Sequence, residues 1–390
     1  RGAEKAKVKA AGYEKGKYAM KEIIWKPELH RFRSCKEFVE EFRLGASDLI
    51  LTNEYIYQPY FGAMNLECTV LYQEQYGMGE PTDVMAEAIL RDAAATGCNR
   101  VVAIGGGTVI DIAKVLAVSD GGPVDALYDN VANLEKRHEL VIVPTTCGTG
   151  SEVTNISIIN RTRIGTKMGL ASEKMFADAA VLVPELLSSL PFGVFATSSI
   201  DALVHAVESS LSPKATAYTK LFGYKAIEMI IRSYQKLVKE GREVLGGLME
   251  DFLIASNYAG LAFGTAGCAA VHAMSYPLGG TYHVPHGESN YAMFTGVLKN
   301  YMEIKQDGEI AVMNGYLADL LGCGVGEVYD KLEELLNQVL PKKALHEYGV
   351  TVQDLDTFTE AVMTTQGRLM GNNFVPLDAE RVRKIYGELY

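Results

Sequence analysis

The hydrophobic pattern changes its character about halfway along the chain. Up to about residue 191, short apolar runs that suit buried strands alternate with helical patterns such as the one over residues 81–96. The apolar runs lie at residues 49–52, 101–104, 140–143 and 179–183. Alternation of this kind is typical of a parallel sheet whose strands are joined by helices. We therefore predict an α/β domain with a parallel, Rossmann-like sheet over residues 20–191.

From residue 192 onward the pattern is that of long amphipathic helices. Apolar residues at helical spacing cover residues 215–240, 244–263 and 325–339. A chain of 390 residues also exceeds the size at which a single core usually keeps growing. We predict a second, all-helical domain over residues 192–390, with no internal repeat in the chain.

Residues 1–19 differ in composition from both of these parts. They are rich in lysine and almost free of large aliphatic residues. They include Glu4 and Glu14, whereas a transit peptide is poor in acidic residues. We interpret this stretch as a tag or an extension, expect it to be disordered and leave it out of the fold prediction.

Three consecutive glycines follow an apolar run in the stretch VVAIGGGTVIDIAK. Gly105, Gly106 and Gly107 would form a tight turn, and Thr108 would begin a helix. Such a turn lets the backbone approach a pyrophosphate, and the helix N-terminus offers free N–H groups and a favourable dipole. The usual G-x-G-x-x-G fingerprint is absent, and glycines before helices also serve packing alone, so both interpretations stay open at this point.

A second polar loop follows the next apolar run, in LVIVPTTCGTGSEVTN. Thr145, Thr146 and Thr149 supply hydroxyl groups among glycines at the end of a predicted strand. Open α/β sheets bind their ligands at the carboxyl ends of such strands. The alternative is an ordinary surface turn.

Asp201 and His205 lie in a helical pattern, SSIDALVHAVESSLS, whose start Ser198 or Ser199 could cap. Residues four apart on a helix project from the same face, so this carboxylate and this imidazole can bind one metal ion. The pair is the first half of a candidate metal site.

Two further histidines complete the candidate site. His272 falls in CAAVHAMSYPLGG, which suggests a helix ending near Pro277 and the Gly279-Gly280 pair, and His286 stands between a proline and a glycine, as on a rigid turn. Three neutral imidazoles and one carboxylate suit Fe(II) or Zn(II), since nitrogen donors favour transition metals over magnesium or calcium. Any one of these histidines alone is more often a core or surface residue, and only the set indicates a metal.

The amino-acid composition limits the kinds of molecule that the protein could bind. The formal charge is −11, from 37 basic and 48 acidic residues, which argues against binding to nucleic acid or to an anionic membrane surface. Six cysteines without a C-x-x-C pair indicate reduced thiols. No continuous apolar run approaches the roughly 20 residues that span a bilayer. We expect a cytoplasmic protein that acts on a small molecule.

Taken together, these segments resemble the iron-containing (group III) alcohol dehydrogenase family, from about Met20 to the C-terminus. The family's glycine-rich signature matches GGGTVIDIAK at 105–114, and its threonine loop matches PTTCGTGSEVT at 144–154. Its metal ligands match Asp201, His205, His272 and His286, including the fourteen-residue step between the last two.

The resemblance implies a role for each segment. It implies two domains, with the active site in the cleft between them, and NAD together with Fe(II), or Zn(II) in its place, as cofactors. A homo-oligomer, a dimer, is expected by the same analogy. The residues implied at the cofactor are Gly105, Gly106, Gly107 and Thr108 at the pyrophosphate, Thr145, Thr146 and Thr149 at the nicotinamide side, and Lys167 at a ribose.

The sequence departs from the family's pattern in three places. Tyr276 stands where members commonly have a histidine near the nicotinamide, so either this hydroxyl or water would handle the proton. Asn53 stands where many members have an aspartate for the adenosine ribose, which leaves the choice between NAD and NADP open. Glu80 replaces the asparagine of an Asn-Pro pair, and a carboxylate there would disfavour a 2′-phosphate and favour NAD.

Within the family, residues 272–294 and the run around Thr145 are most similar to members that interconvert 4-hydroxybutyrate and succinate semialdehyde. Such a substrate carries a carboxylate far from its reacting end, and the site should offer it a cation or several hydrogen-bond donors. We take His283, with Tyr276 beside it, as the candidate group. The alternative is that His283 is an exposed loop histidine that does not bind the substrate.

Two other functions stay open. The protein could act on another primary alcohol, aldehyde or diol. It could also be a lyase similar to dehydroquinate synthase, although the sugar-phosphate substrates of such enzymes need lysines and arginines near the metal, and the segments around Asp201, His272 and His286 contain none. A non-catalytic binding protein fits less well, because it would not need both a metal set and cofactor loops.

Overall fold

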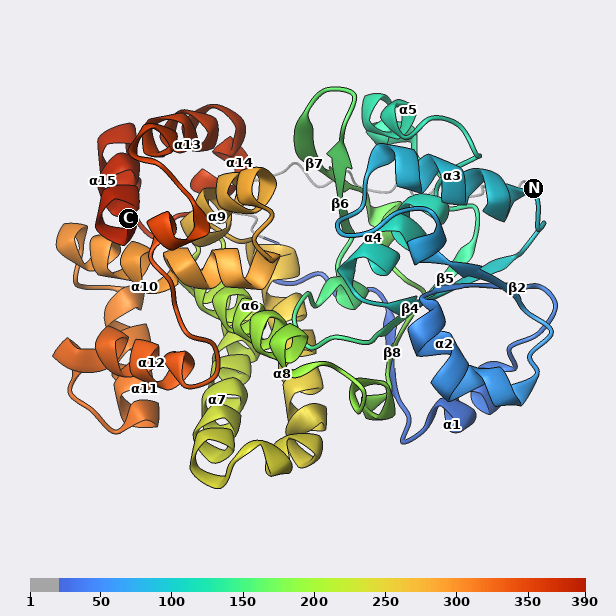
Figure 1. Ribbon diagram of the computed structural model, residues 1–390, viewed down its shortest axis with the longest axis horizontal. Helices are drawn as coiled ribbons and strands as arrows, with labels where there is room; N and C mark the ends of the chain where they lie inside the picture. Colours follow the sequence, from blue (N-terminus) through green and yellow to red (C-terminus); the bar gives the residue numbers. More distant parts are fainter. Residues whose placement is uncertain (1–20) are drawn as a thin grey trace, which may run out of the picture.

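Six parallel strands form the central sheet of the first half of the chain (Figure 1). The computed structural model describes residues 21–390, so the predicted extension at residues 1–19 lies outside the described residues. The spatial order is β1-β8-β5-β4-β2-β3, and every pairing is parallel. The strands are β1 (Glu28–Arg31), β2 (Asp48–Thr52), β3 (Thr69–Tyr72), β4 (Arg100–Gly105), β5 (Glu139–Pro144) and β8 (Ala179–Leu182). The α/β prediction is confirmed.

Helices cover both faces of this sheet, which is why its central strands are apolar throughout. Alternate residues of a strand point to opposite faces. Ile50 and Val102 pack on one face with the core that includes α1 (Cys35–Phe42) and α2 (Glu54–Phe61). Their neighbours Leu49 and Val101 pack on the other face with α3, α4 and α5, which lie opposite α1 and α2 in Figure 1. These last helices span Asp83–Ala94, Gly107–Leu116 and Val124–Asp129.

Four strands were not predicted from the hydrophobic pattern. The strands β1 and β3 are four residues long and lie at the sheet edges, where exposed positions interrupt the apolar signal. The other two, β6 (Ile156–Arg161) and β7 (Thr166–Ala171), form a separate antiparallel hairpin beside α4. This hairpin carries Lys167.

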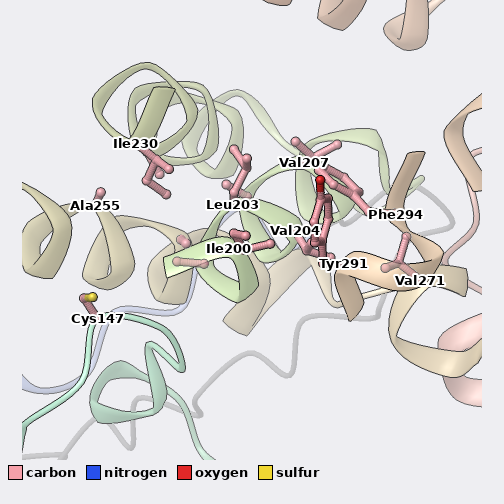
Figure 2. Packing of buried hydrophobic residues seen from close by; sticks show 14 of the residues in the cluster. Cys147, Ile200, Leu203, Val204, Val207, Ile230, Ala255, Val271, Tyr291 and Phe294 are labelled. Atoms are coloured by element: carbon pink, nitrogen blue, oxygen red, sulfur yellow. The ribbon is translucent and has the colours of Figure 1, made fainter. Parts of the chain in front are cut away.

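The second half of the described chain contains helices and no strand, as predicted. The helix α6 (Phe192–Leu211) is buried over most of its length and packs against α7 (Ala217–Glu240), α8 (Met249–Ala266) and α10 (His286–Ile304). Figure 2 shows apolar side chains of α6 among those of the helices around it. The burial of each Leu, Ile or Val side chain there contributes roughly 1.5–3 kcal/mol. The remaining helices are α9 (Ala270–Tyr282), α11 (Glu309–Leu321), α12 (Val328–Asn337), α13 (Val352–Thr365), α14 (Gly367–Met370) and α15 (Ala379–Leu389).

Three local predictions about these helices were wrong. The helix α6 begins at Phe192, so Ser198 and Ser199 lie inside it and do not cap it; the Ser199 hydroxyl donates to the Phe195 carbonyl at 2.7 Å. The helix α9 continues through Pro277 to Tyr282. A proline costs a helix one N–H donor, and the helix is retained here because its flanking residues are buried against α10 and α13. His286 is the first residue of α10 and not part of a turn.

No single helix within residues 21–390 is long and apolar enough to cross a membrane. One sharply bent pair, Arg242–Ala266 and Ala270–Tyr282, meets the criteria of length and composition only when its two members are taken together.

Two glycines of the threonine loop set the distance between the halves of the molecule. A Cβ atom on Gly148 would lie 2.6 Å from the carbonyl oxygen of Ser198 on α6. A Cβ on Gly150, whose φ is 55°, would lie 2.6 Å from Cα of Gly260 on α8. The absence of a side chain at these two positions lets the backbone of the loop after β5 pack directly on the two helices.

A fully buried lysine, Lys114, links separate segments within the sheet half. The Nζ atom of Lys114, on α4, donates to the hydroxyls of Ser151 and Thr154 at 2.7 and 2.9 Å and to the carbonyl of Ile156 at 2.8 Å. Asp111, one turn earlier, accepts from the Ser151 hydroxyl and from the N–H of Ile158. Burial lowers the pKa of Lys114 to about 8, although the negative charge of Asp111 favours the protonated form and opposes this shift. The network connects α4 to the threonine loop and to the β6–β7 hairpin.

Replacing Lys114 by methionine should destabilise the protein by about 3 kcal/mol, because the partly buried Asp111 would lose its cation and three acceptors would lose a donor. Urea denaturation of the variant and the parent measures the difference. Lys36→Met is the matched control, since that side chain is 75% exposed and should change the free energy of unfolding by less than about 0.5 kcal/mol. Equal losses in the two variants would contradict the role assigned to Lys114.

Candidate active site

A cavity of about 300 Å³ lies where the two halves meet. The sheet half lines it with Gly107, Thr108, Thr149 and Lys167, among others. The helical half contributes Asp201, His205, His272, Tyr276, His286 and Arg368. A wider and more open hollow of about 730 Å³ lies beside β1, and none of the predicted site residues lines it. The inter-domain cavity is therefore the candidate active site.

The four predicted metal ligands converge at one end of this cavity. Asp201 Oδ1 lies 3.6 Å from His272 Nε2 and 3.7 Å from His286 Nε2, and Asp201 Oδ2 lies 3.9 Å from His205 Nδ1. The rings of His205 and His272 stack with their centroids 4.6 Å apart. Ligand atoms of Asp201, His272 and His286 lie within 4.8 Å of one another, which suits ligands that share one ion, and His205 forms a second such group with His272 and Cys268. Three nitrogens and one oxygen form a donor set that fits Fe(II) or Zn(II).

The electrostatics of the cluster favour the metal-binding form at Asp201 and His286. Burial opposes the ionisation of Asp201, but the positive charge of neighbouring histidines, led by His205, outweighs it and lowers the pKa of that carboxyl below its ordinary value. Burial lowers the pKa of His286 to about 4, so this imidazole is neutral at pH 7. An ionised carboxylate and a neutral imidazole each offer a lone pair to a cation. Burial opposes the protonation of His205 and His272, but the negative charge of Asp201 and the Cys268 sulfur beside them raises the pKa of both imidazoles, so a metal ion would compete with a proton there.

Two buried side chains contact the candidate ligands: Glu208 lies behind His272, whereas the amide nitrogen of Asn290 lies among the donor atoms, 3.1 Å from His272 Nε2 and 3.2 Å from His286 Nε2. Glu208, on α6, accepts hydrogen bonds from the N–H groups of Ala269 and Val271, and His272 Nδ1 lies 2.6 Å from its Oε2. This contact fixes Nδ1 as the protonated nitrogen and leaves Nε2 facing Asp201. The Asn290 amide donates to Asp201 Oδ1 at 2.7 Å.

The cofactor side of the cavity is built from the glycine turn. A Cβ on Gly105 would lie 2.6 Å from Cβ of Val109, and one on Gly107 would lie 3.2 Å from Cγ2 of Thr149. Gly106 is the N-cap of α4 and has no side chain with which to cap the helix. The first N–H groups of α4 therefore remain available at a wall lined by Gly107 and Thr108, which fits a pyrophosphate.

The predicted cofactor residues fall into two groups. Gly107, Thr108, Thr149 and Lys167 line the cavity, with Lys167 ion-paired to Glu80. Thr145 and Thr146 are not among the lining residues of the cavity. Thr145 is buried, and the buried Thr146 hydroxyl has no hydrogen-bond partner within residues 21–390.

Asn53 is the N-cap residue of α2, and the structure does not bring it to the cavity lining. Its amide donates to Gln73 and Glu74, and its side chain is buried. These contacts place Asn53 at the carboxyl ends of β2 and β3.

The structure separates the two residues predicted to act on the substrate. Tyr276 lines the cavity, and its ring centroid lies 6.0 Å from that of His286. His283 is an exposed residue at the end of α9 with a left-handed backbone (φ 55°), and it is not part of the described lining.

Several residues of the site were missed from the sequence, among them Glu208, Cys268 and Arg368. Glu208 had a detectable signal, because it lies seven positions after Asp201 and so on the same face of an apolar helix. Cys268 lies one turn before His272, and its sulfur is within 4.8 Å of possible ligand atoms of His205 and His272. Arg368 had no signal, since nothing in its surroundings in the sequence relates it to the metal segments.

Replacing Glu208 by glutamine should weaken metal binding about 10- to 100-fold, because an amide holds the proton and the orientation of His272 less firmly than a carboxylate. Equilibrium dialysis of metal-free protein against Co(II) measures the dissociation constant. Glu334→Gln, at an exposed site, should leave that constant unchanged. An equal affinity in Glu208→Gln and the parent would show that Glu208 does not support the ligand.

Comparison with known proteins identifies the family. The profile of iron-containing alcohol dehydrogenases matches residues 31–184, and that of the C-terminal part of the Fe-containing alcohol dehydrogenase family matches residues 195–390. The chain belongs to the iron-containing alcohol dehydrogenase family. The two matched ranges correspond to the sheet half and the helical half.

Relatives in the family cover almost the whole chain. A 4-hydroxybutyrate dehydrogenase of Clostridium kluyveri is 45% identical over 95% of this chain and all of its own length. Long-chain-alcohol dehydrogenase 1 of Geobacillus thermodenitrificans is 34% identical over 88% of this chain and 90% of its own. A sulfoacetaldehyde reductase from Bifidobacterium kashiwanohense, solved with NAD+, shares the fold with a TM-score of 0.81 and 22% identity, over 94% of this chain and 98% of that one.

Proposed function

We propose that the protein is a metal-dependent, NAD-linked dehydrogenase that interconverts 4-hydroxybutyrate and succinate semialdehyde. The identity of 45% to 4-hydroxybutyrate dehydrogenase of C. kluyveri, over that enzyme's full length, carries the choice of substrate. The cavity supports the reaction class, since it combines a buried metal donor set with a wall suited to a pyrophosphate.

Asp201, His205, His272 and His286 would hold the divalent ion. Fe(II) is proposed because of the family, and Zn(II) suits the same donors. Gly105, Gly106, Gly107 and Thr108 would hold the cofactor's pyrophosphate, with Thr145, Thr146 and Thr149 on the nicotinamide side and Lys167 at a ribose. Glu80 adds a negative charge to the cavity, which favours NAD over NADP.

When bound, the metal supplies a Lewis acid for the substrate oxygen and the nicotinamide supplies or accepts the hydride. In the reducing direction the aldehyde carbon gains a hydride and its oxygen gains a proton. The chain contributes orientation and the exclusion of water, the latter through Phe263 and Tyr276 in the cavity wall. Burial raises the pKa of Tyr276, so its hydroxyl keeps its proton at pH 7 and acts as a hydrogen-bond donor.

We also propose that the enzyme acts in the cytoplasm as a homodimer. The six cysteines are all free, which suits a reducing compartment. The dimer rests on analogy with the family.

Purified enzyme should oxidise NADH with succinate semialdehyde only when loaded with Fe(II) or Zn(II). The value of kcat/KM should be at least about tenfold higher than with butyraldehyde, which has the same chain length and no carboxylate, because binding a charged group is worth about 1.5–3 kcal/mol. The loss of NADH absorbance under anaerobic conditions measures both rates. Equal rates with the two aldehydes would favour a less selective alcohol dehydrogenase, and no rate with either would favour the lyase alternative.

A further inference from the structure

The cavity contains few groups that could recognise an anionic substrate. Apart from the metal ligands, its described lining includes two carboxylates, Glu80 and Asp111, and two cationic side chains, Lys167 and Arg368. A substrate carboxylate entering this space would be repelled by the first pair and attracted by the second.

Lys167 already has a carboxylate partner, since its ammonium group is ion-paired with Glu80. It is also the lysine that the proposed function places at the cofactor. Arg368 differs, because within residues 21–390 its guanidinium makes no hydrogen bond or ion pair. A guanidinium presents a rigid fork of N–H donors that matches the two oxygens of a carboxylate.

Arg368 lines the cavity from the helical half and lies beside the β6–β7 hairpin of the sheet half. Its Nη2 atom lies 4.0 Å from the place that a Cβ would take on Gly169, in β7 of the hairpin. Arg368 and Tyr276 line the same cavity as the candidate metal ligands.

The short helix that carries Arg368 is held firmly against the metal-binding segment. Leu369, the next residue, is buried, and α14 packs against α9. The amide of Asn372 donates to the carbonyl of Cys268 at 3.0 Å, close to the start of α9. The Cα position of Arg368 is thus fixed relative to His272, and only its side chain is free to adjust to a ligand.

We propose that Arg368 binds the carboxylate of the substrate and so determines the preference for ω-oxo and ω-hydroxy carboxylic acids. This inference rests on the proposed function and extends it to a named residue. In this arrangement the reacting oxygen of the substrate lies at the metal ligands, and its carboxylate lies at Arg368. The exposed His283 has no part in this arrangement.

The test compares two variants with the parent on two substrates. In Arg368→Gln, kcat/KM for succinate semialdehyde should fall about 10- to 100-fold, mainly through KM, because a charge-assisted contact that forms on binding is lost. The same constant for butyraldehyde should change by less than about twofold. Arg368→Lys should retain an intermediate preference, since it keeps the charge and loses the fork.

Arg91→Gln, on the exposed end of α3, is the matched control and should change neither constant. The dissociation constant for NADH and the bound metal content should be the same in every variant. The midpoint temperature of thermal unfolding should also be the same in Arg368→Gln and the parent, because the Arg368 side chain is exposed.

The outcomes separate the two proposals. If the parent enzyme does not prefer succinate semialdehyde over butyraldehyde, the proposed function fails. If the parent shows the preference and Arg368→Gln retains it, the inference about Arg368 is overturned. An equal loss on both substrates in Arg368→Gln, with NADH and metal binding intact, would also overturn it, because it would show a general role in the site.

Discussion

Asp201 is a buried carboxylate in a largely apolar helix, and the rest of the site depends on how its charge is stabilised. An ionised carboxylate in such surroundings is costly unless a cation and hydrogen bonds compensate. The imidazoles of His205, His272 and His286 surround it, and a divalent ion among these donors would neutralise it. The proposed metal site therefore rests on this charge balance, and its proposed catalytic use rests on the cavity beside it.

The two halves of the molecule make different contributions to that cavity. The helical half supplies the candidate donor set, in which the carboxylate of Glu208 fixes the tautomer of His272. The sheet half supplies backbone N–H groups at the start of α4, and the Lys114 network attaches α4 to the loop that abuts α6. Gly148 and Gly150 allow this close approach. The distance between the metal and cofactor sites is thus set by packing at the junction of the halves.

The fold class and the grouping of Asp201, His205, His272 and His286 at one place could be predicted because their signals are local or repeated. Buried parallel strands are apolar at every position, and Asp201 and His205 are related by one helical turn. The edge strands and the hairpin carrying Lys167 lack such a pattern, since exposed positions break the apolar runs. The path of α9 through Pro277 was missed because tertiary packing outweighs one lost hydrogen bond. Arg368 was missed because only the folded chain brings α14 beside the hairpin.

The most direct test of the metal site is a crystal structure of the protein loaded anaerobically with Fe(II), with data collected to reveal the anomalous signal of iron. The account predicts one peak per chain, about 2.1 Å from donor atoms of Asp201, His205, His272 and His286. A peak that leaves out Asp201, or the absence of any peak in this cavity from a protein that retains its fold, would contradict it.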